Sequence, residues 1–416
     1  PVTLDVMRAG QSLALTDARV EISAVRPHAA AWRGSAEAGD VAVSVRGRLE
    51  YDGMILITLT LAPRDPTRPV VLDAIRLNTA MPEDRALFLN TATDQGYWWY
   101  SYKAWIPEAP GVVHDNLRQR AARTSFLFFT LFSDHDTGLE WFADNLAGWQ
   151  VDESRPVQEI VREPDGTVRL VCHLANQPVE LREPITVTFG YDATPVKPLP
   201  ADWRSAYIHY APLADIASDL ALWWLWSDSR FDPARPNVFL LRPNDLEAFA
   251  AARARTFKVK LSPFVNQHVT LPTFPENQQP DGGWDWFNNL LGAESANDGW
   301  TAMPTRGVRD FWAWNLNTWL DSGSLDAIYI DEANTQTVHA SLLTGSGWRR
   351  ADGTHAFGHN TLGMREQLRR VRQLLLDHGK RPLVWTPTYG MIIPHAFAFV
   401  DINSEGEAYM FDKPDG

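Results

Sequence analysis

The stretch Leu325-Asp326-Ala327-Ile328-Tyr329-Ile330-Asp331-Glu332 decides the fold of the second half of the chain, because an apolar run of β-forming residues ends in two adjacent carboxylates. Runs of this kind form strands that are buried on both faces of a parallel sheet. Charged residues at the carboxyl ends of such strands gather where these sheets bind their ligands. The stretch therefore predicts a buried strand that delivers carboxylates to a site.

Side-chain alternation separates the two carboxylates. Tyr329 and Asp331 are two residues apart, so they share the strand face that points to the centre of the fold, while the isoleucines beside them pack against covering helices. Glu332 points to the opposite face unless the chain has already turned into the following loop, residues 333–335. Alternation alone therefore predicts that Asp331 lies in the site, whereas Glu332 joins it only through an early turn.

Strand-like and helix-like patterns alternate through the second half of the chain. Strands are predicted at residues 257–264, 325–331, 382–386 and 397–402, and helices at about 309–320 and 362–378. Residues expected on the buried stripes of these helices are Trp312, Leu316, Trp319, Leu320, Leu368, Val371 and Leu375. Polar residues follow several strands, which favours a (β/α)8-type TIM barrel over an open sheet. About six strands can be counted, so the barrel is predicted to be incomplete at its carboxyl end.

The first half of the chain is predicted to be all-β. Asp52-Gly53 stands between two strand-like runs and predicts a tight hairpin, since both turn residues must tolerate positive φ. Further strand-like runs cover residues 125–132, 168–174 and 184–189, and this spacing is typical of a β-sandwich. Residues 193–200 contain three prolines and predict the link between domains. We therefore expect a β-sandwich domain over residues 1–195 and a (β/α) barrel domain over residues 196–416.

Composition and charge limit the classes of protein and of binding partner that are possible. Hydrophobic residues make up 45% and charged residues 21% of the 416 positions, as in ordinary globular proteins. No apolar run reaches the ~20 residues of a membrane-spanning helix, and a net charge of -13 opposes nucleic-acid binding. Cys172 is the sole cysteine, which excludes an internal disulfide. The chain begins at Pro1 without a signal-like segment, so we expect a soluble protein, secreted or periplasmic if its amino terminus has been processed.

No metal or other cofactor is expected. His355 and His359 have the four-residue spacing of a helical metal-binding pair, but Gly353 and Gly358 weaken any helix that would aim both at one ion. The sequence also lacks a Gly-rich phosphate loop, a dinucleotide fingerprint and a nucleophile elbow.

Tryptophan is the outlier in the composition, with 18 residues, many of them in runs. Flat aromatic faces stack on the apolar C–H faces of sugars, although Trp also fills large cores, and we expect the core role for more than half of these residues. The pair Trp98-Trp99 lies in the first domain and reaches a site in the second only if the domains pack closely. A carbohydrate is therefore the predicted partner, and the oligomeric state is open.

The Asp331-Glu332 pair suits the cleavage of a glycosidic bond, which needs a carboxylic acid to protonate the leaving oxygen and a group that stabilises the positive anomeric centre. Glu332 is the candidate acid. Its pKa, ordinarily about 4.3, must rise for this role, and a neighbouring anion and aromatic surroundings act in that direction. In substrate-assisted enzymes the stabilising group is the 2-acetamido oxygen of the substrate, which a protein carboxylate orients and polarises. A strand-end cap with a surface salt bridge is the structural alternative for the pair.

Five stretches together suggest a family. They are Glu50-Tyr51-Asp52-Gly53, Gly138-Leu139-Glu140-Trp141-Phe142-Ala143-Asp144-Asn145 with Gly148-Trp149, Ala193-Thr194-Pro195-Val196-Lys197-Pro198-Leu199-Pro200, Tyr329-Ile330-Asp331-Glu332, and Asn403-Ser404-Glu405-Gly406-Glu407. In these stretches the chain resembles glycoside hydrolase family 123, the β-N-acetylgalactosaminidases, and the glycoside-hydrolase-like proteins related to it. The resemblance implies a β-sandwich followed by a (β/α) barrel. It also implies retaining hydrolysis in which the aspartate of the Asp-Glu pair assists the acetamido group and the glutamate is the acid/base, roles that carry over to Asp331 and Glu332 only.

Polar and aromatic residues near the other strand ends are the candidate substrate-binding groups. Carboxylates and amides at these positions suit sugar hydroxyls, and aromatic rings suit the floor of a sugar subsite. The full predicted set is Asn266, His268, Tyr329, Asn334, Trp385, Tyr389, Glu405, Glu407, Trp98 and Trp99. For each of them, core packing or loop hydrogen bonding is the structural alternative.

Three functions remain open from the sequence. The leading prediction is a retaining β-N-acetylhexosaminidase that degrades a polysaccharide or oligosaccharide, with Asp331 and Glu332 as the working pair. The second is a retaining glycosidase on a neutral sugar, with Asp331 as nucleophile and Glu405 or Glu407 as acid/base, which requires carboxyl groups ~5 to 5.5 Å apart. The third is a non-catalytic carbohydrate-binding protein. The sugar, its linkage, and exo or endo action are open in all three.

Overall fold

The computed structural model describes most of the chain. The described residues are 1–92, 101–118, 126–201, 206–209, 220–225, 260–266, 269–270, 300–301, 304–321, 323, 325–331, 333, 338–339, 342, 345–350, 352–387, 391 and 393–403. They fall into two compact units, the first made of residues 1–197, 347–359 and 391–395, and the second of residues 198–346, 360–390 and 396–416. The sequence predicted two consecutive domains and therefore did not assign residues 347–359 and 391–395 to the first unit.

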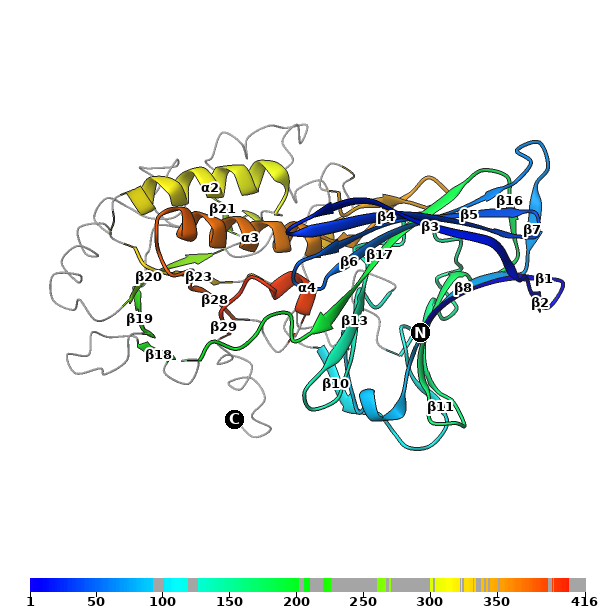
Figure 1. The fold of residues 1–416 in the computed structure, drawn as a ribbon, viewed down its shortest axis with the longest axis horizontal. Coiled ribbons are helices and arrows are strands. Elements are labelled where there is room, and N and C mark those ends of the chain that lie inside the picture. Colours follow the sequence, from blue (N-terminus) through cyan, green and yellow to red (C-terminus); the bar gives the residue numbers. More distant parts are fainter. Residues whose placement is uncertain are drawn as a thin grey trace. The chain divides into compact units, whose positions relative to one another are not determined.

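Two antiparallel sheets form the first unit (Figure 1). The larger sheet has the order β10 (Ser101–Trp105), β9 (Phe88–Ala92), β12 (Phe129–Ser133), β13 (Gly138–Phe142), β17 (Ile185–Thr194), β6 (Ile55–Pro63), β5 (Val41–Glu50), β4 (Ala29–Ala38) and β3 (Leu15–Arg26). The smaller sheet has the order β11 (Gly111–Asp115), β14 (Gln158–Arg162), β15 (Val168–Ala175), β8 (Ala74–Met81), β1 (Val2–Arg8) and β2 (Gln11–Ser12). Short elements complete it: β7 (Val70–Leu72) paired with β16 (Val179–Leu181), β25 (Trp348–Arg349) paired with β26 (His355–Ala356), β27 (Gly358–His359) and the 3-10 helix η1 (Glu83–Arg85).

The core of this unit lies between the two sheets, as strand alternation predicts. Along β15, Val168, Leu170 and Cys172 are buried at every second position. They face the buried side chains of the larger sheet, and the hydroxyl groups of Thr79 on β8 and Tyr191 on β17 bridge the two sheets at 2.7 Å. The predicted all-β first half is therefore confirmed as two sheets packed face to face.

The hairpin predicted at Asp52-Gly53 is also confirmed. Gly53 has a φ of 102°, and its backbone N–H donates to the carbonyl oxygen of Glu50 at 3.1 Å. One boundary differs: β17 continues through Thr194, inside the stretch predicted to link the domains, because the strand still pairs there with Gly138 of β13.

The second unit contains a parallel sheet, which confirms the strand and helix alternation. Its order is β18 (Ala206–His209), β19 (Leu220–Leu225), β20 (Lys260–Asn266), β23 (Ile328–Asp331), β28 (Val384–Thr386) and β29 (Ile402–Asn403), and each neighbouring pair is parallel. The remaining described elements are β21 (Val269–Thr270) paired with β22 (Trp300–Thr301), β24 (Val338–His339), and the helices α2 (Arg306–Asp321), α3 (Thr361–Asp377) and α4 (Pro394–Phe397). Among the described strands β18 and β29 do not pair, so closure into a TIM barrel stays a prediction.

Helices α2 and α3 connect strands of this sheet, lie side by side and confirm the two predicted helices (Figure 1). The side chain of Asn360 caps α3 by accepting the backbone N–H of Gly363 at 3.1 Å. The residues predicted for the buried stripes are all buried, namely Trp312, Leu316, Trp319, Leu320, Leu368, Val371 and Leu375. An ion pair between Asp310 and Arg370 joins the outer faces of the two helices.

The predicted strand at residues 397–402 is wrong over most of its length. Pro394 begins α4, as proline favours in a first helical turn, and the helix ends at Phe397. The backbone N–H of Val400 then donates to the carbonyl oxygen of Phe397 at 2.9 Å, which forms a turn. The apolar run is buried as a helical turn and a bend, and β29 begins only at Ile402.

No helix among the described residues is both long enough and apolar enough to span a membrane.

Candidate active site at the carboxyl ends of the parallel strands

The register of the parallel sheet brings predicted site residues to one edge. Asn266 and Asp331 are the last residues of β20 and β23, and they are direct register partners. Thr386 and Asn403 end β28 and β29 and are partners in the same way. Because all these strands run parallel, their carboxyl ends lie along the same edge, which is where open and closed parallel sheets bind ligands.

Aromatic residues form a layer one step below these ends. Tyr329 and Trp385 are register partners on β23 and β28, and their rings meet edge to face with centroids 4.6 Å apart. Tyr329 is 6% exposed and Trp385 is 1% exposed. Burial of this degree supports packing beneath the strand ends, which is the structural alternative that the sequence left open for both residues.

Ion pairs fix the strands that bear these residues. Arg372 of α3 contacts both carboxylate oxygens of Asp401 at 2.6 and 2.7 Å, and the same carboxylate accepts the backbone N–H of Val384 at 3.1 Å. At the amino end of β23, Asp326 lies 3.6 Å from Lys380. The carboxylates of Asp326 and Asp401 therefore have structural partners.

The remaining predicted site residues lie outside the described residues. They are Glu332, His268, Asn334, Tyr389, Glu405, Glu407, Trp98 and Trp99. For Asp331 and Asn266 the structure describes the strand and its register. The pairing of Asp331 with Glu332, and the substrate-binding roles, therefore stay predictions.

The described residues contain no group of three or more His, Cys, Asp or Glu side chains that could hold an ion. His355 and His359 lie on the short strands β26 and β27, so the helix that would aim both at one ion is not formed.

Sequence reasoning missed a buried cluster in the first unit. Glu140 and Asp192 are register partners on β13 and β17, and both are fully buried. Directly opposite residues of an antiparallel pair share a sheet face, so the two carboxylates belong to one cluster. Oxygen Oε2 of Glu140 accepts the backbone N–H of His395 at 2.9 Å and lies 3.0 Å from His395 Nδ1. The signal available in the sequence was a charged residue inside the apolar strand Leu139-Glu140-Trp141-Phe142.

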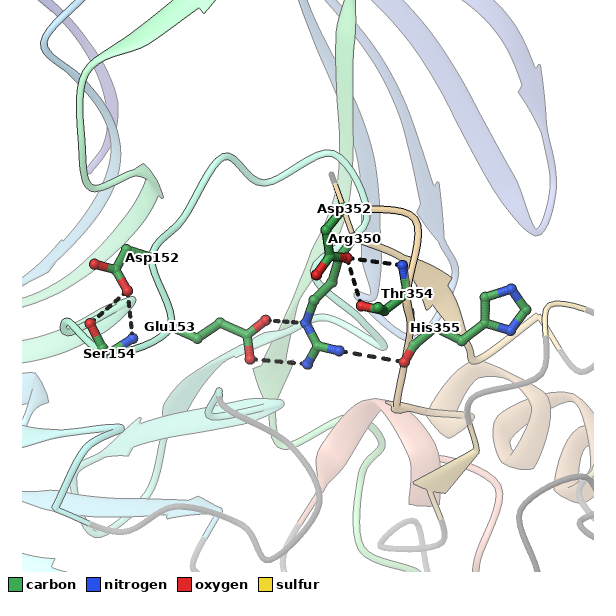
Figure 2. Close-up of polar contacts among 7 residues, drawn as sticks. All are labelled: Asp152, Glu153, Ser154, Arg350, Asp352, Thr354 and His355. Atoms are coloured by element: carbon green, nitrogen blue, oxygen red, sulfur yellow. Dashed lines mark hydrogen bonds and ion pairs between the residues drawn. The ribbon is translucent and has the colours of Figure 1, made fainter.

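A second late segment, residues 347–359, forms a small hairpin in the same unit. Figure 2 shows the guanidinium of Arg350 held by both carboxylate oxygens of Glu153, at 2.6 and 3.2 Å, and donating to the backbone carbonyl of His355. The carboxylate of Asp352 accepts the backbone N–H of Thr354 at 2.9 Å and its hydroxyl at 2.7 Å, which closes the hairpin turn. These Thr354 hydrogen bonds lower the pKa of Asp352, the hydroxyl more than the backbone N–H.

Comparison with known families supports the resemblance drawn from the sequence. Residues 1–100 match the family model described as glycoside hydrolase 123, third domain. This match confirms the likeness to that family for the first quarter of the chain, which holds β1 to β9. Among curated proteins, none matches the chain.

Solved structures that resemble this one include three glycosidases. The GH36 α-galactosidase AgaA from Geobacillus stearothermophilus has 10% identity and a TM-score of 0.47, with 98% of this chain and 64% of that chain covered. The α-galactosidase from Lactobacillus brevis has 9% identity and a TM-score of 0.46, with 97% and 62% covered. A β-arabinopyranosidase has 11% identity and a TM-score of 0.34, with 96% and 63% covered. The chain thus spans less than two thirds of each of these proteins, and the scores lie below the level at which a shared fold follows.

Proposed function

We propose that the protein is a glycoside hydrolase that removes a β-linked N-acetylhexosamine with retention, using the acetamido group of the substrate. The observation that carries the proposal is the register that ends β20 and β23 together at Asn266 and Asp331. The match of residues 1–100 to a glycoside hydrolase 123 domain supports the reaction class. The Asp331-Glu332 pair supplies the two carboxylates that the reaction needs. In this proposal the parallel sheet closes into a (β/α) barrel around them.

Each carboxylate has a distinct task in the proposed reaction. Asp331 stays ionised and accepts the N–H of the 2-acetamido group, so that the amide oxygen becomes more negative and attacks the anomeric carbon. Glu332 begins protonated and gives its proton to the glycosidic oxygen as the bond to the anomeric carbon breaks. A water molecule then opens the cyclic intermediate, and Glu332 takes the proton of that water, which returns both groups to their starting states and retains the configuration.

The primary test compares three variants on aryl glycosides of N-acetylglucosamine and N-acetylgalactosamine. Glu332→Gln is expected to lower kcat/KM by about a hundredfold to ten-thousandfold on substrates with a poor leaving group, and far less on nitrophenyl glycosides, which leave without protonation. Asp331→Asn is expected to slow both substrate types, because the amide no longer gains nucleophilic character. Asp326→Asn is the matched control, since it changes a carboxylate of the same apolar run that contacts Lys380 instead.

A second substrate series separates the proposed mechanism from its alternatives. Replacing the acetamido methyl group by trifluoromethyl weakens the amide oxygen as a nucleophile, so the rate falls steeply if that oxygen attacks. Equal rates on both substrates, or turnover of neutral hexosides lost in Asp331→Asn, point instead to Asp331 as a nucleophile with Glu405 or Glu407 as acid/base. Glycan binding without hydrolysis of any substrate would mean a non-catalytic carbohydrate-binding protein and would refute the proposal.

A further inference from the structure

We propose that the protein forms a symmetric dimer in which strand β3 of one copy pairs edge to edge with β3 of a second copy, about a two-fold axis that passes through Val20. β3 lies at one edge of the larger sheet, and among the described strands β4 is its only partner. The backbone N–H and C=O groups on its outer side are therefore available to a further strand. This inference concerns the sandwich unit alone and does not depend on the proposed reaction.

The length and exposure of β3 favour pairing with another strand. Edge strands that stay unpaired are usually short or carry lysine or proline, and β2, at an edge of the smaller sheet, has only two residues. β3 is 12 residues long, contains neither lysine nor proline, and is exposed at every position. Val20, Ile22 and Val25 are 77%, 69% and 75% exposed. A long edge strand with exposed apolar side chains is a template for the strand of another chain.

The apolar side chains of β3 lie on the face of the larger sheet that forms the core. Val20 is opposite Gly34 of β4, and Gly34 is opposite Val45 of β5. Val45 is in turn opposite Leu59 of β6, which is buried. Residues directly opposite one another share a face, so the core face of the sheet continues to β3 and is exposed there.

Trp32 of β4 leaves Ile22 exposed on this face. The two residues are register partners, but the indole ring of Trp32 lies over Gly47 of β5, because a Cβ atom at Gly47 would lie 2.0 Å from Trp32 Cζ2. The ring therefore covers the side of β4 that faces β5 and not the side that faces β3. In the proposed dimer Ile22 lies opposite Ala18 of the second copy, which covers part of its side chain.

Charge complementarity selects the second copy as the partner and Val20 as the axis. With Val20 on the two-fold axis, Arg19 lies opposite Glu21 of the second copy, and the same pair forms again on the other side of the axis. An axis at Arg19 or at Glu21 places like charges opposite each other, which is destabilising. An axis at Ile22 places Glu21 opposite Ser23, the extra residue of a β-bulge. Val20 is therefore the position in this part of β3 at which the strand complements itself.

An ion pair within each copy supports this arrangement. Glu21 contacts Arg33 of its own β4 at 2.8 Å, so in the dimer its carboxylate lies between two guanidinium groups. Irregularities in β3 limit the length of the pairing, because the strand is regular against β4 only from Arg19 to Ile22, with a register shift on either side. A short pairing buries less surface than a standard interface, so the dimer is expected to dissociate in the micromolar range.

Charge reversal tests the register, with sedimentation velocity of the full chain over the micromolar range at physiological ionic strength. Arg19→Glu and Glu21→Arg each place like charges opposite each other in the dimer and are expected to raise its Kd by about tenfold or more. An equimolar mixture of the two variants opposes unlike charges again on both sides of the axis, so it is expected to recover the dimer. Arg46→Glu is the matched control, since it makes the same change in net charge at an exposed position of β5 and should leave the Kd within about threefold.

Cysteine crosslinking tests the position of the axis. Val20→Cys places two thiols opposite each other, within the Cα separation of about 4.4 to 6.8 Å that a disulfide bridges. Ile22→Cys places them four residues apart along the paired strands, which is about 14 Å. Mild oxidation by dissolved oxygen is therefore expected to give a covalent dimer of the first variant and not of the second. The native Cys172 is buried, so it adds little background.

A wild-type protein that stays monomeric over the whole concentration range overturns the proposal, and so does an effect of Arg46→Glu equal to that of Arg19→Glu. If the mixture of charge variants does not recover the dimer, or if Ile22→Cys crosslinks as readily as Val20→Cys, another surface or register joins the copies and the proposal is again overturned. Because the substituted side chains of β3 are exposed, each variant is expected to keep the Tm of the wild-type monomer, which thermal unfolding checks.

Discussion

Gly190→Ala is expected to be among the most destabilising single-methyl additions in the sandwich unit. The new Cβ atom would lie 2.2 Å from Phe142 Cζ, 2.6 Å from Phe142 Cε1 and 2.7 Å from the backbone oxygen of Ile55. Carbon atoms in contact prefer separations of about 3.5 to 4.0 Å, so the ring must move by more than 1 Å. It cannot do so freely, because Phe142 is 1% exposed and is stacked on His395 at 3.6 Å. The Ile55 carbonyl belongs to the paired strand β6 and is equally restrained.

The magnitude follows from the cost of overpacking a filled core, typically 1 to 3 kcal/mol and occasionally more. Because one contact is with backbone, we expect about 2 to 4 kcal/mol, which corresponds to a fall in Tm of roughly 5 to 15 °C for a unit of this size. Urea unfolding at neutral pH measures the free energy, and thermal unfolding measures Tm. Hydrogen exchange in residues 391–395 is expected to rise in the same variant.

Gly34→Ala is the matched control on β4 of the same sheet. A Cβ atom there would lie 3.2 Å from the backbone oxygen of Arg19 and 3.6 Å from Val20 Cγ2, so a shift of a few tenths of an ångström accommodates it. Its effect is expected to lie within about 1 kcal/mol of zero, since alanine is also favoured over glycine in a strand. Equal destabilisation by the two substitutions would refute the steric argument, and so would strict additivity of Gly190→Ala and Phe142→Leu in a double-mutant cycle, because the two sites are in contact.

Three further predictions concern charge. Burial lowers the pKa of His114 to about 4, so between pH 6.5, near the ordinary pKa, and pH 4 only the unfolded chain takes up this proton. The free energy of unfolding of the wild-type protein should therefore fall by about 2 to 3 kcal/mol over that range. Urea unfolding at pH 7 and pH 4.5 measures the loss, and His114→Phe should lack the part of it that His114 causes. The hydrogen bond to the Leu374 carbonyl, and then Asp321, raise the pKa of His378 in the folded protein. The protonated histidine therefore stabilises the folded protein fully below its ordinary pKa, and this stabilisation disappears as pH rises through the pKa of the folded state. If the free energies of unfolding of the wild-type protein and His378→Gln depend on pH in the same way from pH 6 to 9, this prediction is contradicted. Arg350→Met removes the two-point contact with Glu153 and should cost about 1 kcal/mol, with faster hydrogen exchange confined to residues 347–359; unchanged exchange there would show that the ion pair does not hold the hairpin.

Elements with a strong local pattern could be predicted from the sequence. The hairpin at Asp52-Gly53 requires positive φ in its turn, and the period of buried residues in α2 and α3 is visible in the sequence alone. The strand ending at Asp331 was predictable because a continuous run of apolar, β-forming residues is typical of a strand buried on both faces of a parallel sheet. The run at residues 397–402 misled because apolar residues that fill a helical turn and a bend look the same as a short buried strand.

The division of the late segments between the units could not be predicted. Residues 347–359 and 391–395 have no composition that marks them as part of a sandwich, and their partners are remote: Glu140 and His395 are 255 positions apart. Periodicity reports which face of an element is buried but not which element covers it. His359 stacks on Phe128 and His395 stacks on Phe142, and neither contact can be predicted from the local sequence around these histidines.

The resemblance to glycoside hydrolase 123 can now be divided into a part that concerns folding and a part that concerns chemistry. Gly148 is an example of the first: its φ is 82°, and a Cβ atom there would lie 2.0 Å from the Thr186 carbonyl oxygen, so the fold requires glycine. Glu140, in the same matching stretch, binds a backbone N–H in a fully buried setting. The β-sandwich fold requires residues of this kind independently of the reaction that the protein catalyses. Substitutions at Gly148 are therefore expected to lower Tm, whereas Asp331→Asn at the strand end should lower turnover with little change in Tm. This contrast tests which part of the resemblance to the family concerns the fold and which part concerns the reaction.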